Sequence, residues 1–157
     1  MPEPPIAAGS RFAGVAEDFA ETRGAGGPNL WRTLGFRRTG WEPGGSTVEW
    51  DATVDYGFQT PGGPVIQGGL VTAILDSAMG GACYTTLNHD ELFLTADLRV
   101  EFFRPTRPGR LRAVGRVLRR TRKVAFCAAS LHDADGVTLA ESRCTQVVLL
   151  QEFLKER

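Results

Sequence analysis

Residues 67–83, QGGLVTAILDSAMGGAC, form the stretch of sequence that decides the fold. Nearly every position is apolar or small, and Asp76 is its single acid. The stretch predicts one helix that runs to about residue 84, roughly 24 Å long at about 1.5 Å per residue. Burying an unpartnered carboxylate costs several kcal/mol or shifts its pKa, so Asp76 must be paired, hydrogen-bonded or functional.

The two sides of this helix differ. At about 100° per residue, the side suited to packing on a sheet carries Leu70, Val71, Ile74, Ala78 and Gly81. The side that carries Asp76 has mostly small residues, namely Gly69, Thr72, Ala73, Met79, Gly80 and Cys83. Small residues let another backbone, a partner helix or a ligand come close, so we expect Asp76 to lie on an open, weakly polar surface. The other interpretation is a solvated or salt-bridged acid on a tightly packed helix.

The rest of the sequence predicts an α+β domain around this helix. A length of 157 residues suits a single core. Before the helix, residues 36–39 and 46–56 predict a hairpin about a turn at 42–45, and residues 59–64 predict a loop. After it, four alternating segments predict an antiparallel meander, at residues 94–103, 110–120, 124–133 and 137–150. The expected fold has five or six antiparallel strands wrapped around one long helix.

The first 28 residues differ from the rest in composition. They are rich in Pro, Gly and Ala, so we expect a loosely ordered segment with at most a short helix near residues 15–21. Asn29 is placed to cap a brief helix over residues 30–34. The predicted domain therefore spans residues 29–157.

Charge and cysteine content exclude several classes of protein. The 18 basic and 18 acidic residues balance, which argues against a dedicated nucleic-acid binder. Because the first residues include no basic cluster followed by an apolar run, we expect no signal peptide, and no apolar run is long enough to predict a membrane span. Three cysteines without metal-ligand spacing predict reduced packing residues and no metal site. We expect a cytoplasmic protein.

One motif resembles a known family. Gln67-Gly68-Gly69 followed by Asp76-Ser77-Ala78 resembles the His-Gly-Gly to Asp helix signature of the hotdog-fold acyl-CoA thioesterases of the PaaI type. The likeness continues in order and spacing through Leu34-Gly35-Phe36, residues 97–105 and residues 115–140. It covers roughly residues 29–149, and it implies a hotdog fold and hydrolysis of an acyl-CoA to a carboxylic acid and CoA.

The resemblance also implies roles for particular residues. The Gly68 N–H would polarise the thioester carbonyl, and Asp76 would act as general base or nucleophile. Thr95 would position Asp76 or its water, although its alternative is an ordinary β-branched strand residue. Eight positions of one helix separate Gly68 from Asp76 by about 12 Å, so one chain cannot bring both to the same carbonyl. A homodimer with antiparallel helices would, and the family arrangement further implies a dimer of dimers.

The sequence departs from the family pattern at two positions. Gln67 stands where the family has His, and it retains hydrogen-bonding groups that can shape the loop beside Gly69. The Asn or Gln expected earlier in the loop falls at Pro61, unless a two-residue insertion gives that role to Gln59. The change at Gln67 keeps a second hypothesis open, a non-catalytic hotdog module that binds acyl-CoA or another acyl ligand.

The coenzyme is expected to bind as part of the substrate, with no separate cofactor. Seven of the eighteen basic residues lie within residues 110–123. Such a cluster is suited to the phosphates of CoA near its final turn, at Arg119, Arg120, Arg122 and Lys123. Its alternative is a solvated basic face.

Candidates for the acyl pocket are bulky apolar residues near the helix. They suit an aromatic or medium-chain acyl group and comprise Phe58, Met79, Tyr84, Leu87 and Phe93. A Ser-His-Asp hydrolase is not expected, because the only histidines, His89 and His132, accompany no Gly-x-Ser-x-Gly motif.

Overall fold

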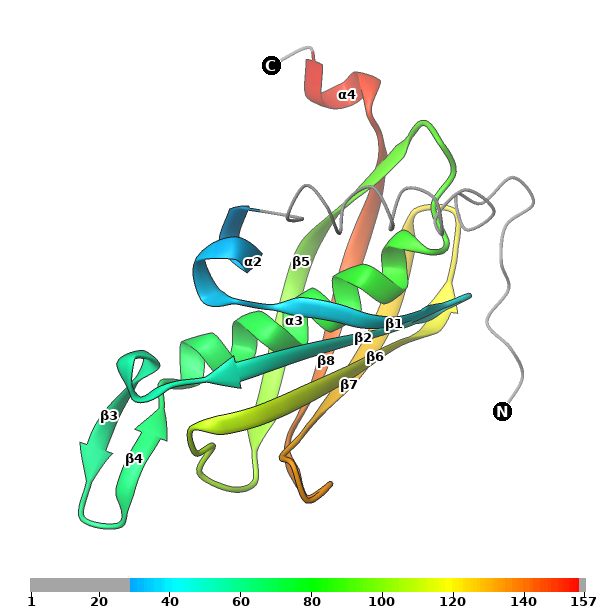
Figure 1. Cartoon of the computed structure of the whole chain (residues 1–157). Coiled ribbons are helices and arrows are strands. Elements are labelled where there is room, and N and C mark those ends of the chain that lie inside the picture. The colour runs from blue at the N-terminus through cyan, green and yellow to red at the C-terminus, as the bar shows by residue number, and fades with distance from the viewer. Residues whose placement is uncertain (1–28, 156–157) are drawn as a thin grey trace.

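A computed structural model describes residues 29–155, which form a curved antiparallel sheet around one long helix (Figure 1). The sheet has six strands in the order β1-β2-β6-β7-β8-β5, and β3 and β4 form a separate hairpin. The strands are β1 Arg37–Glu42, β2 Gly45–Ala52, β3 Gly57–Thr60, β4 Gly63–Ile66, β5 Glu91–Phe102, β6 Gly109–Arg120, β7 Val124–His132 and β8 Thr138–Leu150. The helices are α2 Asn29–Leu34, α3 Gly68–Tyr84 and α4 Glu152–Lys155, with a 3-10 turn at Val54–Tyr56.

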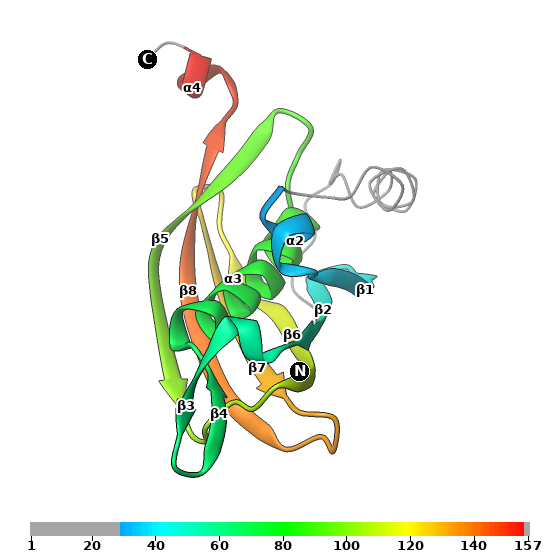
Figure 2. The same ribbon diagram turned by 60° about the vertical axis from the view of Figure 1, so that its left-hand side comes forward.

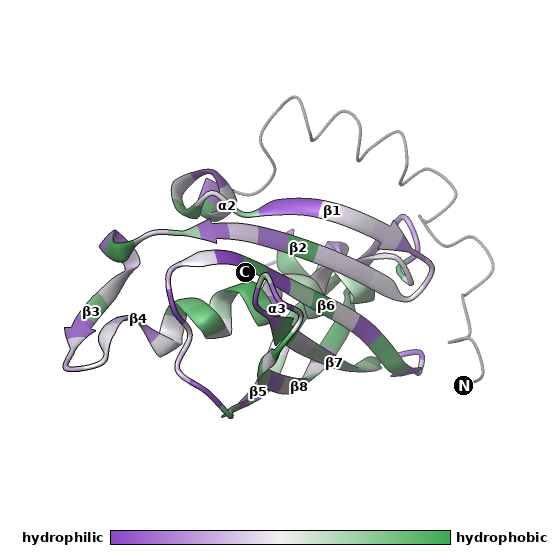
Figure 3. Cartoon of the chain, turned by 60° about the horizontal axis from the view of Figure 1, so that its bottom comes forward, coloured by the Kyte–Doolittle hydropathy of each residue, from purple (hydrophilic) through white to green (hydrophobic). Residues whose placement is uncertain are grey.

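The central helix lies where the sequence predicts it. α3 covers Gly68–Tyr84 and contacts strands β1, β2, β5, β6, β7 and β8, so the sheet wraps it as expected (Figure 2). The core between them includes Trp50, Ile74, Leu111 and Leu131, each no more than 1% exposed. Coloured by hydropathy, α3 is mostly apolar and β1 carries hydrophilic residues (Figure 3). The prediction of an α+β hotdog fold is confirmed.

Helix and sheet approach each other most closely at Gly115 of β6. A Cβ atom on this residue would lie 2.2 Å from the carbonyl oxygen of Ala78 in α3. That distance is far below van der Waals contact, so only glycine lets the helix backbone rest on β6 here.

The order of the strands corrects the predicted meander. β6, β7 and β8 are sequential neighbours, but β5 pairs with β8 and lies at the edge of the sheet. The connection between β5 and β6 contains Pro105 and Pro108, which do not suit a tight hairpin turn. β5 therefore does not fold back on β6, and its outer edge has no partner within the described residues.

The segment before α3 also differs from its prediction. Residues 53–56, expected to continue a strand, instead include the 3-10 turn Val54–Tyr56. The expected loop at 59–64 is the tip of the β3–β4 hairpin, with Pro61 and Gly62 at the turn. Such short strands carry too few residues to show alternation, which is why the pattern suggested only a loop.

The wrapped sheet covers more of α3 than one side. Met79 and Cys83, predicted on the open side with Asp76, are both fully buried in the core. The prediction failed because a curved six-stranded sheet contacts the second half of the helix from several directions. The possible helix near residues 15–21 lies outside the described residues, and no described helix is long and apolar enough to cross a membrane.

Candidate active site

Asp76 lies half-buried on α3, opposite β5. Its Oδ1 accepts a hydrogen bond of 3.1 Å from the Thr95 hydroxyl. Burial raises the pKa of Asp76 above its ordinary value, and the Thr95 hydrogen bond acts in the opposite direction. The carboxyl group therefore has one fixed partner and a pKa closer to neutrality, as suits a group that exchanges protons.

A bulge in β5 aims Thr95 at the helix. The pairing of β5 with β8 shifts between Thr95 and Asp97, which leaves Ala96 as an extra residue. Before the bulge Thr95 faces α3, and after it Leu98 packs against the core. In a regular strand residues three apart face opposite sides, so the bulge is what brings both inward.

Gly68 and Gln67 shape the entry of α3. Gln67 is the N-cap residue, and its Oε1 accepts a hydrogen bond of 3.1 Å from the Leu70 N–H. A Cβ atom on Gly69 would lie 2.7 Å from that same oxygen, so glycine makes room for the cap. Gly68 is the first helical residue, where backbone N–H groups have no intrahelical acceptor.

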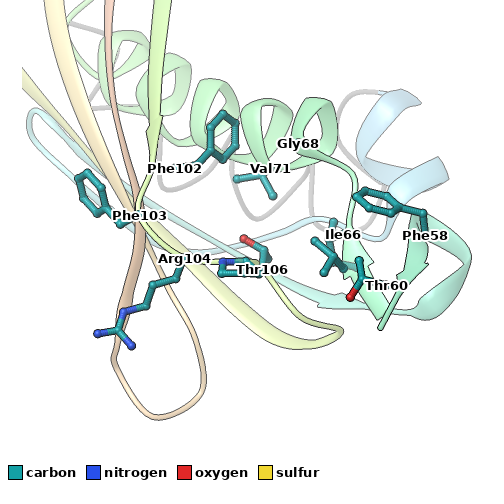
Figure 4. A pocket seen from close by; sticks show the side chains of 11 residues that line it. Phe58, Thr60, Ile66, Gly68, Val71, Phe102, Phe103, Arg104 and Thr106 are labelled. Carbon is teal, nitrogen blue, oxygen red and sulfur yellow. The ribbon is translucent and has the colours of Figure 1, made fainter. Parts of the chain in front are cut away.

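An apolar groove of about 390 Å³ opens beside Gly68, between the β3–β4 hairpin, the end of β5 and α3 (Figure 4). Arg104 borders the groove, and its guanidinium points away in Figure 4. Most of the lining is hydrophobic and comes from Phe58, Val65, Ile66, Val71, Phe102 and Phe103. Its size and lining suit an acyl chain.

The predicted pocket residues do not all meet at this groove. Phe58 lines it, but Phe93 packs near Gly80, farther along the helix. Met79 and Leu87 are buried in the core, and Tyr84 packs against it, so these three side chains do not line this groove. Gln59 lies exposed in β3, opposite Pro64.

The basic turn lies near the other end of α3. The Arg120 guanidinium forms an ion pair of 3.0 Å with Glu91, and both side chains are about nine-tenths buried. The same Glu91 carboxylate accepts the Asn88 N–H just after the helix, so Arg120 holds this connection in place. The exposed basic residues of the turn are Arg119, Arg122 and Lys123.

Two features behind Asp76 were missed from the sequence. Gln146 of β8 is fully buried, and Thr95 Oγ1 donates to its Oε1 at 2.9 Å. Next to it lie two of the three buried free cysteines, Cys144 and Cys127, which stand opposite each other where β7 pairs with β8. Gln146 stands at an inward position of an alternating strand, and that polar exception was the available signal. No group of three or more potential metal ligands forms among residues 29–155.

Several known proteins are similar to this chain. Residues 63–140 match the family model of the thioesterase superfamily. The chain is 33% identical over 97 residues to the medium/long-chain acyl-CoA thioesterase YigI of Salmonella typhimurium, a match over 54% of this chain and 63% of that protein. The Escherichia coli K12 protein of the same name is 32% identical over the same extent.

Solved structures share the fold. A thioesterase family protein from Silicibacter pomeroyi matches with a TM-score of 0.74 and 23% identity, over 88% of this chain and 98% of that one. A putative thioesterase from Ralstonia eutropha, described as related to phenylacetic acid degradation, matches with a TM-score of 0.69 and 29% identity, over 76% and 89%. Residues 63–140 match the thioesterase superfamily, and the chain has the hotdog fold of these solved structures, which confirms the resemblance found in the sequence.

Proposed function

We propose that this protein hydrolyses acyl-CoA thioesters to a carboxylic acid and CoA, with Asp76 as the acid–base or nucleophilic group. The observation that carries the proposal is the half-buried Asp76, held by Thr95, within the part of the chain that matches the thioesterase superfamily. The named activity of the YigI relatives, medium- and long-chain acyl-CoA hydrolysis, supports the choice of substrate class. The matched segment covers 63% of their length.

The chemistry requires a negative charge to be stabilised at the thioester oxygen. As a general base, Asp76 would take a proton from water while the water oxygen attacks the carbonyl carbon. As a nucleophile, it would attack directly and form an anhydride that water then opens. In either case the Gly68 N–H, at the positive end of the α3 dipole, would donate to the developing oxyanion.

Neither route can be completed by Gly68 and Asp76 of one chain, because about 12 Å of helix separates them. A second subunit would supply the missing group. The outer edge of β5 is the surface suited to it, since the strand is twelve residues long and leaves its outer edge open within the described chain. Leu94 and Phe102 on this strand are both about half exposed. Long apolar edge strands are usually covered in native proteins.

The positions along β5 agree with such a dimer. Along β5, Thr95 lies beside Asp76, to which it donates a hydrogen bond. Phe102 lies beside Gly68, because a Cβ atom on Gly68 would be 3.5 Å from the Phe102 ring. Two β5 strands that pair antiparallel about a twofold axis at Arg99, with the bulge at Ala96 counted as one position, would set Thr95 opposite the partner subunit's Phe102. Asp76 would then lie near the partner subunit's Gly68.

The apolar groove beside Gly68 would receive the acyl chain. A thioester carbonyl held at the Gly68 N–H would direct its chain toward Val71 and Phe102, which line the groove together with Phe58. A mostly hydrophobic lining favours medium or long chains over short polar acyl groups. The exposed Arg119, Arg122 and Lys123 stay as candidates for the phosphates of CoA, whereas Arg120 is engaged by Glu91.

Thiol release from a panel of CoA thioesters tests this proposal. We expect turnover of medium- and long-chain acyl-CoA and a loss of about 10²–10⁴-fold in kcat for Asp76→Asn, the usual contribution of a positioned base. Ser77→Ala, one residue along the same helix, is the matched control. Unchanged turnover by Asp76→Asn would refute the role of this acid. Stabilisation by acyl-CoA without hydrolysis would favour a binding module, the alternative raised by Gln67.

A further inference from the structure

Gln146 is a fully buried polar side chain with an unusual set of partners. Its Nε2 lies 3.2 Å from Cys144 Sγ, and its Oε1 lies 2.9 Å from Thr95 Oγ1. It belongs to β8, where it stands opposite Thr95 in the strand register. A buried amide is costly unless it is hydrogen-bonded, so these contacts determine its effect on the protein.

The Thr95 hydroxyl has two acceptors and a single proton. Asp76 Oδ1 lies 3.1 Å away on one side, and Gln146 Oε1 lies 2.9 Å away on the other. When Asp76 is ionised, its carboxylate is the stronger acceptor, and the Thr95 hydroxyl donates its hydrogen bond to Asp76. The Gln146 carbonyl oxygen then faces a lone pair, without a donor from Thr95.

Protonation of Asp76 removes this conflict. A neutral carboxyl group is a weaker acceptor and can itself donate an O–H to Thr95 Oγ1. The Thr95 proton is then free to turn to Gln146 Oε1, and each oxygen along the chain Asp76–Thr95–Gln146 has a partner. The arrangement therefore favours the protonated state of Asp76.

We propose that Gln146 is a positioning residue that stabilises the protonated form of Asp76, because its Oε1 accepts the hydrogen bond from the Thr95 hydroxyl when Asp76 carries a proton. In the general-base route the proton of the attacking water moves to the Asp76 carboxylate, and the Thr95 proton turns from Asp76 to Gln146. The same proton later leaves with the CoA thiolate, and Thr95 turns back. This inference rests on the proposed role of Asp76 and adds a group that makes it a stronger base.

Few other titratable groups lie near the hydrogen-bonded side chains of Asp76, Thr95 and Gln146. The pKa of the Cys144 thiol, on β8, is lowered by its hydrogen bond with Cys127, while burial and the carboxylates of Asp76 and Asp97 act in the opposite direction. Asp97 lies on β5, just beyond the bulge. Neither group hydrogen-bonds Thr95, so the Thr95 proton is shared by Asp76 and Gln146.

Two measurements on the full chain test this inference. NMR of the Asp76 carboxyl carbon across pH gives the pKa of Asp76, and the pH profile of kcat/KM gives the pKa that controls the reaction. Gln146→Met removes the amide at nearly constant volume, and Gln146→Leu serves if the methionine variant does not fold. We expect the pKa of Asp76 and the acid limb of the profile to fall by roughly 0.5–1 pH unit, the size of one lost neutral hydrogen bond. The rate plateau should fall a few-fold, because a more acidic carboxyl is a weaker base.

Two further variants separate this role from general support of the fold. In a Thr95→Val background, Gln146→Met should leave the pKa of Asp76 unmoved, because the connection is already broken. Val148→Ala, two residues along β8 and also buried, should lower stability without moving this pKa.

The outcomes are distinct. An unchanged pKa in Gln146→Met would overturn the inference, as would a rise, which would show that the amide nitrogen faces Thr95. Because the NMR titration needs no turnover, it decides the role of Gln146 even if no CoA thioester is hydrolysed. That last result would refute only the proposed function.

Discussion

The two halves of α3 have opposite relations to the sheet. In residues 68–76 only Val71, Ile74 and Leu75 are buried, whereas every residue of 78–83 is buried. The sheet closes around the second half, where Gly115 lets β6 reach the helix backbone, and it leaves the first half beside an apolar groove. Changes in the first half should therefore alter chemistry, and changes in the second half should alter stability.

Among the variants compared below, Gly68→Pro in the open half is expected to have the largest effect. Proline is tolerated at the first helical position, where it removes only the backbone N–H. A Cβ atom fits there at 3.5 Å from Phe102, and the preceding Gln67 is already extended. We expect kcat for acyl-CoA hydrolysis to fall about 10²–10³-fold with little change in Tm, as for loss of one oxyanion donor. Activity near the wild-type level would remove Gly68 from the mechanism.

Gly115→Ala tests the closed half. The added methyl group meets the Ala78 carbonyl oxygen at 2.2 Å, so α3 must move off the sheet. We expect about 3 kcal/mol or more of lost stability in urea unfolding, since overpacking against a rigid backbone is at the costly end of its range. Gly62→Ala, at the β3–β4 turn, is a control for adding a methyl group away from the core, because its nearest neighbour is the flexible end of Arg107 at 3.3 Å. Equal stability of Gly115→Ala and wild type would contradict the close approach.

Gln67→Ala should have a smaller effect on stability. It removes the side-chain acceptor of the Leu70 N–H, and loss of an N-cap typically costs about 1 kcal/mol. Gln67→Asn, which can cap a helix, should restore much of it. Urea unfolding of wild type and the two variants measures how much this cap contributes to the free energy of unfolding. Equal stability of Gln67→Ala and wild type would contradict a stabilising cap and leave substrate binding as the role of Gln67.

The smallest expected effect is on the pH dependence of stability. Burial, the larger influence on Asp76, raises its pKa above the ordinary value of 3.8. The folded protein therefore binds a proton at Asp76 more tightly than the unfolded chain does. This contribution to stability is lost as the pH rises from 3.8 through the pKa of Asp76 in the folded protein. Asp76→Asn should therefore be more stable than wild type near neutral pH, and the difference should vanish at low pH. Thermal unfolding across pH 3–8 checks the sign, and a variant less stable at neutral pH would contradict it.

Much of the fold followed from local patterns. Small and apolar residues at helical spacing predicted α3 almost to the residue, and alternation predicted β6, β7 and β8. The meander failed because alternation says nothing about which strands pair, and the edge position of β5 depends on the long connection through Pro105 and Pro108. Met79 was misplaced because helical angles alone do not reveal how far a curved sheet wraps.

The candidate site was predictable only in part. The contact of Asp76 with Thr95 followed from the family resemblance and is present in the structure. The bulge that makes it possible was not foreseen, because apolar residues recur at every second position from 92 to 102 without interruption at Ala96. The alternation of β8 could have shown that Gln146 is buried, but only the structure shows that its amide faces Thr95.

The central claim is that each active site combines Gly68 of one subunit with Asp76 of another. Gly68→Pro and Asp76→Asn subunits, each inactive alone, can be mixed in equal amounts, unfolded and refolded together, with thiol release as the readout. Random pairing gives about half mixed dimers with one intact site each, so the account predicts recovery of about one quarter of wild-type activity. No recovery, with mixed dimers confirmed by mass spectrometry, would contradict it.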